Sequence, residues 1–196
     1  NQSGSADQLG FLAGYIAAVI TQDWRVGVIS QADTAAGKAA RQGFVNGVVF
    51  YCGLCRPIYP PFYTYPVYTE IPAGASVEAQ QAAADMLINS AVQTAYIAPE
   101  VAEDFLLEAL VKAGVKVIGG RTPTAAPVEQ WVTTLQADWT VLLSEAWQRL
   151  VDGDGGFQID APLTMSEANP QHISAARQRL IEQLSQDMLA GYIDTG

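Results

Sequence analysis

Residues 131–156, WVTTLQADWTVLLSEAWQRLVDGDGG, join a short β-rich run directly to an amphipathic helix. The run at 131–136 is rich in Val, Thr and Trp, which favour strands, whereas apolar residues recur at helical spacing from 139 onward. A strand that opens at once into such a helix indicates a chain that crosses between two lobes. The stretch therefore predicts a crossover, provided that an α/β unit precedes it.

The preceding residues have the pattern of an α/β unit, because apolar strand-like runs alternate with helical runs. Such alternation is typical of a parallel sheet with right-handed crossovers and helices on its faces. A crossover appended to this Rossmann-like unit predicts a bilobal ligand-binding protein. The first helix is apolar nearly all round, and its small residues, such as Gly10 and Gly14, predict close approach to the sheet. The pattern predicts strands at 25–30, 67–71, 94–98 and 115–119 and helices at 8–22, 34–50, 76–91 and 100–113.

Charge and length limit the partners of the chain. Its 196 residues carry ten Lys and Arg against twenty Asp and Glu, a net charge of −10. Phosphate recognition needs clustered basic residues, so we expect no nucleic-acid partner. The longest apolar run, residues 11–20, is much shorter than the ~20 residues that span a bilayer. Because the chain starts at Asn1, we expect that an upstream segment was removed.

Several segments together resemble a known family. They are GFLAGYIAAVI at 10–20, RVGVISQADTAAGKAARQGFVNGV at 25–48, VKVIGG at 115–120, the crossover, and ARQRLIEQLSQDMLAGYI at 176–193. In this order they resemble the second half of the basic membrane protein family of solute-binding lipoproteins. That family has the type 1 periplasmic-binding fold, so the resemblance implies one lobe of such a protein with crossover elements of a second lobe.

The resemblance also implies a domain organisation. Residues 8–130 and 157–165 would form a lobe of the C-terminal type, and 170–193 a C-terminal helix. The crossover strand and helix at 131–156 would pack on an N-terminal lobe that is missing here. Family members are extracytoplasmic receptors of ABC importers, which implies a membrane permease as partner and a membrane anchor upstream of this chain. Several bind purine nucleosides between their lobes.

Two positions depart from the nucleoside-binding pattern. After VKVIGG the family places an acid that holds ribose hydroxyls, but this chain has Arg121 and Thr122. Where the family has a lysine soon after the TT of the crossover, this chain has Gln136. The lobe architecture therefore transfers better than the nucleoside ligand. A guanidinium in place of an acid predicts a preference for carboxylate or phosphate groups.

The ligand itself is expected at the carboxyl ends of the strands, where parallel sheets bind small molecules. The loops there are short and polar, as a small polar ligand requires. As an alternative, Asp33, Thr34 and Glu100 only cap helices, and Arg121 only forms a surface ion pair. The candidate ligand-binding residues are Ser30, Asp33, Thr34, Glu100, Arg121, Thr122 and Gln136.

Catalytic patterns are missing from the sequence, and we expect neither an enzyme nor a cofactor. The single histidine, His172, lies in a turn before the last helix, and there is no nucleophile elbow, phosphate-binding loop or Gly-x-Gly-x-x-Gly run. Residues 152–156, DGDGG, resemble the opening of a calcium loop but lack its later glutamate. They predict a turn that ends a helix, and no metal site.

Cys52 and Cys55 form a C-x-x-C pair with three interpretations. Zinc would need two further ligands, and a thioredoxin-like pair would lie at a helix N-terminus. A structural disulfide needs neither and fits an oxidising, extracytoplasmic compartment, although unpaired buried thiols remain an alternative.

The following segment, 56–68, is rich in tyrosine and proline. It predicts either a stacking surface for a ligand or partner or an extended loop over the sheet edge.

Two classes of function remain open from the sequence. The first is an extracytoplasmic solute-binding component of an ABC-type importer, which closes two lobes on a small polar ligand. The alternative is an intracellular ligand-sensing or interaction domain of the same fold. An oxidised cysteine pair favours the first class, and an upstream signalling segment would favour the second.

Overall fold

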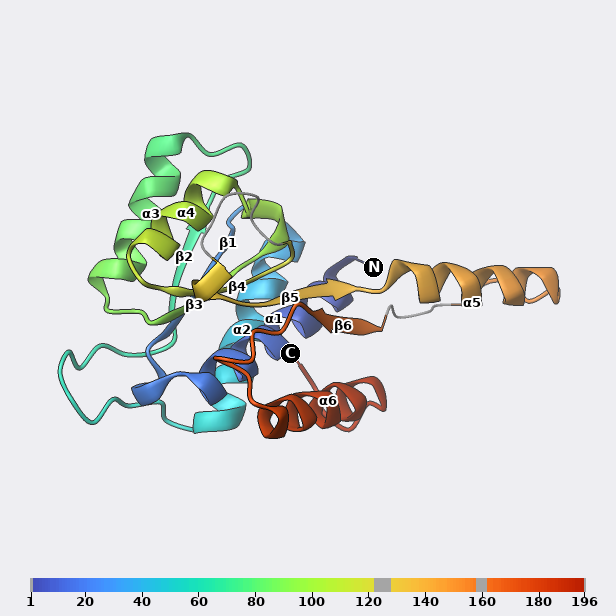
Figure 1. Ribbon diagram of the computed structural model, residues 1–196. Coiled ribbons are helices and arrows are strands. Elements are labelled where there is room, and N and C mark those ends of the chain that lie inside the picture. Colours follow the sequence, from blue (N-terminus) through green and yellow to red (C-terminus); the bar gives the residue numbers. More distant parts are fainter. Residues whose placement is uncertain (1, 122–127, 158–161, 196) are drawn as a thin grey trace.

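The protein is an α/β structure built on one mostly parallel sheet (Figure 1). The computed structural model describes residues 2–121, 128–157 and 162–195. Within them the sheet has six strands in the order β2-β1-β3-β4-β5-β6. The first five run parallel, and β6 pairs antiparallel with β5. The strands are β1 (Val26–Gln31), β2 (Val67–Ile71), β3 (Thr94–Ile97), β4 (Lys116–Gly119), β5 (Trp131–Ala137) and β6 (Leu163–Ser166).

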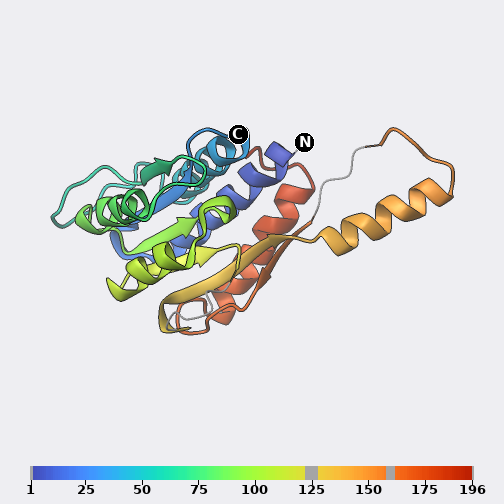
Figure 2. The same cartoon turned by 90° about the horizontal axis from the view of Figure 1, so that it is seen from above.

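Helices cover both faces of the sheet (Figures 1 and 2). The first, second and last pack on one face, where α1 contacts α2 and α6, and the third and fourth pack together on the other. This arrangement confirms the predicted fold class. The α-helices are α1 (Gln2–Ile20), α2 (Ala35–Cys52), α3 (Val77–Asn89), α4 (Asp104–Lys112), α5 (Trp139–Val151) and α6 (Ala175–Leu189), with short 3-10 turns at η1 (Gln22–Trp24), η2 (Pro99–Val101) and η3 (Val128–Gln130).

The predicted helix at 100–113 is interrupted in the structure. Pro99 opens the short turn η2, and α4 begins only at Asp104. Between them the backbone of Glu103 is extended, with ψ of 143°. The side chains of Val101 and Ala102, on either side of the end of η2, are both buried in the core.

Helix α1 is buried on nearly all sides, as its apolar sequence predicts. Its glycines, however, face helix α2 instead of the sheet. A Cβ added at Gly10 would collide with the Ala40 carbonyl, and one at Gly14 with the Phe44 carbonyl. In return Gly43 and Gly47 of α2 lie against the backbone of α1. Only residues without a Cβ let two helix backbones touch, which is why the close approach is between helices.

The crossover stretch divides at its middle. Strand β5 pairs with β4, with Ile118 opposite Thr133 and Gly119 opposite Thr134, so it is the fifth strand of this sheet. The expectation that this strand belongs with a second lobe is therefore wrong. Helix α5 alone leaves the body and projects from it as an arm (Figures 1 and 2). None of its residues is buried.

The chain returns from α5 through residues 152–157, which are largely exposed and include the predicted turn, to the edge strand β6. Because β6 runs opposite to β5, the sheet is not wholly parallel as predicted. The C-terminal helix α6 is shorter than the predicted 170–193, since residues 170–173 form a turn and Ser174 caps the helix. It packs beside α1.

Candidate ligand-binding edge of the sheet

The strand order creates a switch point between β1 and β3. The chain leaves β1 toward β2 on one side and leaves β3 toward β4 on the other, and sheets of this order bind ligands in the crevice between the two loops. Hydrogen bonds tie the start of each loop to the neighbouring strand at this edge. The Ala98 amide donates to the Ile29 carbonyl at 3.0 Å, and the Ala32 amide to the Ile71 carbonyl at 2.9 Å.

Ser30 lies at the end of β1, beside the switch point, and is fully buried. Its hydroxyl has no hydrogen-bond partner among the described residues. Buried polar atoms are nearly always paired, because an unpaired one costs about 1–3 kcal/mol. Ser30 is therefore the candidate residue with the clearest spare hydrogen-bonding capacity.

Asp33 and Thr34 have structural partners. The Thr34 hydroxyl accepts the Gly37 amide at 3.0 Å and caps α2, and it donates to the Gln31 side chain at 3.2 Å. The Asp33 carboxylate accepts the Ala73 amide at 3.2 Å and ties the loop after β1 to the loop after β2. The capping interpretation thus describes Thr34, whereas the exposed Asp33 links two strand-end loops.

Glu100 follows β3 in the turn η2 and is exposed. It lies near Tyr96, a fully buried residue of β3 whose ring stacks on Phe44 with centroids 6.0 Å apart. Burial, and to a lesser degree the negative charge of Glu100, raises the pKa of the Tyr96 phenol. Glu100 therefore adds negative potential at the switch point without being buried itself.

Arg121 pairs with residues at the start of α4. Its guanidinium lies 3.0 Å from the Asp104 carboxylate and donates to the Ala102 carbonyl at 2.7 Å. Both charged side chains are about half exposed, 50% and 49%. Because a guanidinium has five N–H groups, these contacts leave others for a ligand. Thr122 lies outside the described residues.

Gln136 lines a hollow of about 280 Å³ at the carboxyl ends of β3, β4 and β5. Its side-chain amide donates to the Gly120 carbonyl at 2.6 Å, which joins the ends of β5 and β4. The sequence-based list missed the other lining residues, although several adjoin positions on it: Pro99 precedes Glu100, and Gly120 precedes Arg121. The hollow is lined by Leu9, Pro99, Gly120, Leu135, Gln136, Ala137 and Trp139.

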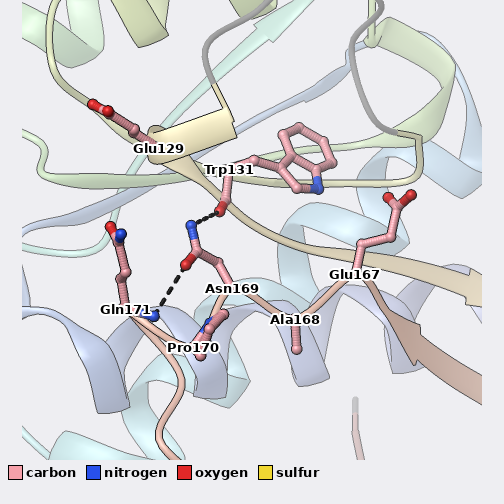
Figure 3. Close-up of a pocket in the computed structure, with 7 residues that line it drawn as sticks. All are labelled: Glu129, Trp131, Glu167, Ala168, Asn169, Pro170 and Gln171. Carbon is pink, nitrogen blue, oxygen red and sulfur yellow. Dashed lines mark hydrogen bonds between the residues drawn. The ribbon is translucent and has the colours of Figure 1, made fainter.

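A larger hollow, of about 560 Å³, lies at the opposite end of β5 (Figure 3). Its polar groups hold a turn in place: the Asn169 amide donates to the Trp131 carbonyl at 3.1 Å and its carbonyl accepts the Gln171 amide at 3.0 Å. His172 is fixed at the same turn, with Nε2 2.7 Å from the Glu129 carbonyl. Because this hollow adjoins the amino end of β5, away from the strand-end loops, we place the candidate site at the smaller one.

The cysteine pair lies away from this edge, at the end of α2. The structure joins Cys52 and Cys55 as a disulfide with Cα atoms 5.1 Å apart.

No group of three or more His, Cys, Asp or Glu suited to a metal ion occurs in the described part of the chain. None of the described helices is both long and apolar enough to cross a bilayer.

Comparisons place this geometry among known folds. No protein-family model and no curated protein matches the sequence. A solved ABC transporter solute-binding protein from Conexibacter woesei covers 96% of this chain with a TM-score of 0.66 at 19% identity. One from Aeropyrum pernix K1 covers 96% with a TM-score of 0.66 at 16% identity. The chain shares the fold of ABC transporter solute-binding proteins.

A LacI-family transcriptional regulator from Burkhoderia phymatum is also similar, with a TM-score of 0.51 at 19% identity over 83% of this chain. The chain spans 62%, 64% and 60% of the three solved structures, less than two thirds of each. The similarity to the two solute-binding proteins confirms the predicted periplasmic-binding type of fold. Membership of the basic membrane protein family stays a prediction.

Proposed function

We propose that this chain is the ligand-binding lobe of an extracytoplasmic solute-binding protein of an ABC importer. The observation that carries the proposal is the edge formed by the carboxyl ends of the strands, which holds two features. One is the Ser30 hydroxyl on β1, which has no partner among the described residues, and the other is the hollow beside Gln136 at the ends of β3, β4 and β5. Small polar loops there suit a small polar solute. The similarity to two solute-binding proteins of this fold supports the same role.

A second lobe completes the proposed site. Trp139 at the start of α5 lines the hollow, and the helix then carries Leu143 and Trp147, both mostly exposed, away from the body. An apolar helix face of this kind is normally covered. The solved solute-binding proteins contain more than a third of their length beyond the part that matches this chain. We propose that a lobe of the N-terminal type packs on α5 and closes over the hollow.

The ligand class follows from Arg121 and its neighbours. The half-exposed guanidinium keeps its contact with Asp104 and offers its remaining N–H groups to a carboxylate or phosphate. In the sequence GRTPTAA, which follows β4 at 120–126, no carboxylate replaces the ribose-binding acid of nucleoside receptors. The proposal is therefore a small polar or anionic solute, and a nucleoside would bind weakly.

An intracellular sensing domain is the second candidate, because the LacI-family regulator shares the fold. Its TM-score of 0.51 is lower than the 0.66 of the solute-binding proteins. The Cys52–Cys55 pair also favours an oxidising compartment. We therefore rank the solute receptor first, with a membrane permease as its partner.

Native mass spectrometry of the complete protein tests the proposal by detecting a copurified solute. Calorimetric titration with nucleosides, sugars, amino acids and phosphorylated metabolites then ranks the classes. Gln136→Ala and Trp139→Ala should each weaken binding about tenfold or more, because each removes a contact at the hollow. Gln171→Ala, which changes the larger hollow, is the matched control and should leave affinity unchanged.

The outcomes separate the two hollows and the ligand classes. Loss of binding in Gln171→Ala alone would move the site to the amino end of β5 and contradict the proposal. Tight nucleoside binding that persists in Arg121→Ala would contradict the proposed ligand class. Binding of no solute from any class by the complete protein would contradict the receptor function itself.

A further inference from the structure

The loop at residues 53–66, between α2 and β2, forms the pole of the molecule opposite α5 (Figure 1). Three large apolar side chains protrude there, with Leu54 exposed to 79% and Ile58 and Phe62 each to 72%. Exposed apolar groups this large, gathered in one short loop, mark a surface that meets another apolar phase. The loop lies apart from the candidate ligand site and is not explained by it.

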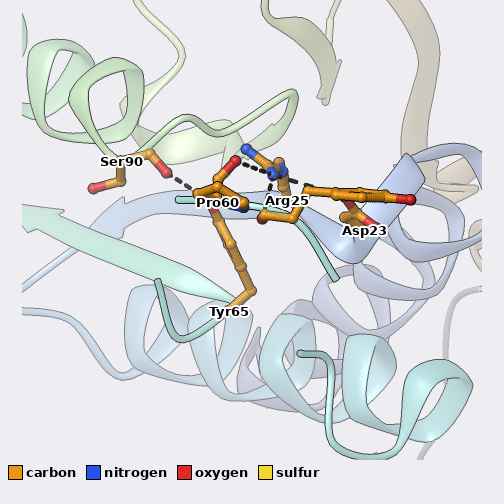
Figure 4. Close-up of polar contacts among 6 residues, drawn as sticks. Asp23, Arg25, Pro60, Tyr65 and Ser90 are labelled. Carbon is orange, nitrogen blue, oxygen red and sulfur yellow. Dashed lines mark hydrogen bonds and ion pairs between the residues drawn. The ribbon is translucent and has the colours of Figure 1, made fainter. Parts of the chain in front are cut away.

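The loop is held in one shape by contacts at its base (Figure 4). Arg25 donates through Nη2 to the carbonyls of Tyr59 and Pro60, at 2.8 and 2.9 Å. The Tyr65 hydroxyl donates to the Ser90 carbonyl at 2.7 Å, and its ring is buried. The protruding side chains are therefore presented by an anchored backbone, and ordering them on a partner costs little entropy.

Charge is distributed unevenly around this pole. The chain has twenty acidic residues, yet none occurs between Asp33 and Glu70. Within the loop Arg56 is the single charged residue, and no described residue pairs with its guanidinium. An acidic protein is repelled by anionic headgroups, but loop 53–66 has no carboxylate of its own to desolvate, and the nearby Asp23 lies 3.6 Å from the Arg25 guanidinium that holds the loop.

The backbone of the loop also has few groups left to desolvate. Residues 57, 60, 61 and 66 are proline and have no N–H, and Arg25 already satisfies two of the carbonyls. The three most exposed apolar side chains of the loop, Leu54, Ile58 and Phe62, offer no hydrogen-bond donors to a partner, so the side-chain donors of the loop are confined to polar residues such as Arg56 and Tyr59. A lipid surface needs none. Tyrosines such as Tyr59 and Tyr63 are typical of the bilayer interface.

A hollow in the loop also fits a phospholipid. It has a volume of about 540 Å³ and runs between residues 54–57 and 62–64. Its lining residues include the cationic Arg56 together with the apolar Leu54 and Phe62. A cation beside apolar groups matches a phospholipid, whose phosphate lies next to its acyl chains.

We propose that loop 53–66 inserts into the headgroup and upper acyl region of a phospholipid bilayer, with Leu54, Ile58 and Phe62 as its apolar anchors and Arg56 at the phosphates. The role goes beyond solute binding and does not depend on it. It gives the protein a fixed orientation on a membrane, with the pole opposite α5 facing the lipid.

Flotation of the purified protein with phosphatidylcholine vesicles tests the proposal. The double variant Leu54→Ser/Phe62→Ser should lower the partition coefficient about tenfold or more, because two apolar anchors are lost. Leu189→Ser/Tyr192→Ser, which changes two exposed apolar residues at the end of α6, is the matched control and should partition like the parent. Urea unfolding of each variant verifies that the fold is intact.

Ile58→Asp provides a second test that retains Leu54 and Phe62. A carboxylate at this tip should abolish flotation, because the charge would have to leave water. The proposal is overturned if the parent protein does not float with the vesicles, or if the control loses as much partition as the loop variant. It is also overturned if loop variants change self-association in sedimentation and leave flotation unaltered, since the loop would then join copies of this chain.

Discussion

At the scale of single residues, the candidate site combines groups with structural partners and groups without. Thr34 is used as a helix cap, and Arg121 has an ion-pair partner in Asp104. Ser30 has neither role, although its sequence context does not distinguish it from any serine at a strand end. Residue type and position could predict that these side chains gather at one edge, because parallel strands end together. Which of them are already paired depends on neighbours that lie far away in the chain.

Ser30→Ala should separate stability from binding. Removing a buried hydroxyl without a partner should raise the free energy of unfolding by about 1 kcal/mol, because the desolvation cost disappears. The same change should weaken solute binding, because we propose that the hydroxyl contacts the ligand. Urea unfolding and calorimetric titration measure the two effects. A destabilised variant would mean that the hydroxyl is paired in the native protein.

Because Tyr96 is buried, we expect the protein to lose stability in alkali. Burial, followed by the charge of Glu100, raises the pKa of its phenol in the folded state, whereas in the unfolded chain it ionises near pH 10. The contribution of the neutral Tyr96 phenol to the free energy of unfolding is therefore complete below about pH 10. It is lost as pH rises from there toward the folded-state pKa. Between pH 8 and pH 11 the free energy of unfolding of Tyr96→Phe should fall by about 1 kcal/mol less than that of the parent, as measured by urea unfolding. Equal losses would contradict this assignment.

At the scale of elements, the contact between α1 and α2 depends on four glycines. Their spacing of four places Gly10 and Gly14 on one side of α1, opposite Gly43 and Gly47 of α2. The sequence predicted both helices and the close approach of α1, but not its partner. Spacing identifies which side of a helix is small. It does not identify which surface that side meets, since a sheet and a helix can both accept it.

Gly14→Ala should be strongly destabilising. The added methyl would collide with the Phe44 carbonyl, so the two helix backbones must separate, at a cost of about 1–3 kcal/mol or more. Gly155→Ala is the control, because nothing lies within 4 Å of its added methyl. Urea unfolding compares the two variants. A Gly14→Ala protein as stable as the control would show that α1 and α2 are not in backbone contact.

The cysteine pair closes α2 against the start of loop 53–66. We expect an intramolecular disulfide in the native protein, visible as a two-hydrogen mass difference before and after reduction. Loss of the bond in Cys52→Ser/Cys55→Ser should cost about 2 kcal/mol, by the chain-entropy relation for so short a loop. Alkylation of both thiols under non-reducing conditions would contradict the bond and remove its support for an extracytoplasmic location.

At the scale of the whole molecule, the two poles differ in how they present their exposed apolar side chains. Helix α5 carries Trp147 and Leu150 into solvent on an arm, whereas loop 53–66 presents its apolar tips from an anchored base. The first surface needs a folded partner of matching shape, because a regular helix face packs into grooves. The second presents three apolar side chains, Leu54, Ile58 and Phe62, which a lipid surface accepts without a matching shape.

Helix α5 should therefore be the least protected helix in the isolated chain. Its amides should exchange with deuterium much faster than those of α1, which is buried on nearly all sides. A form of the protein that contains the proposed second lobe should exchange more slowly at α5, with little change at α1. Hydrogen exchange followed by mass spectrometry measures both. Equal protection of α5 in the two forms would show that no lobe packs on it.

The sequence by itself determined the alternation of strands and helices, the apolar first helix and the strand-to-helix run at 131–156. These features depend on local periodicity and on capping residues, which act within a few positions along the chain. Only the tertiary structure decided that β5 joins this sheet, that Arg121 pairs with Asp104, and that no described residue hydrogen-bonds to the Ser30 hydroxyl. Each of these facts depends on groups far apart in sequence, and a chain's local pattern does not encode which distant groups meet when its hydrophobic core closes.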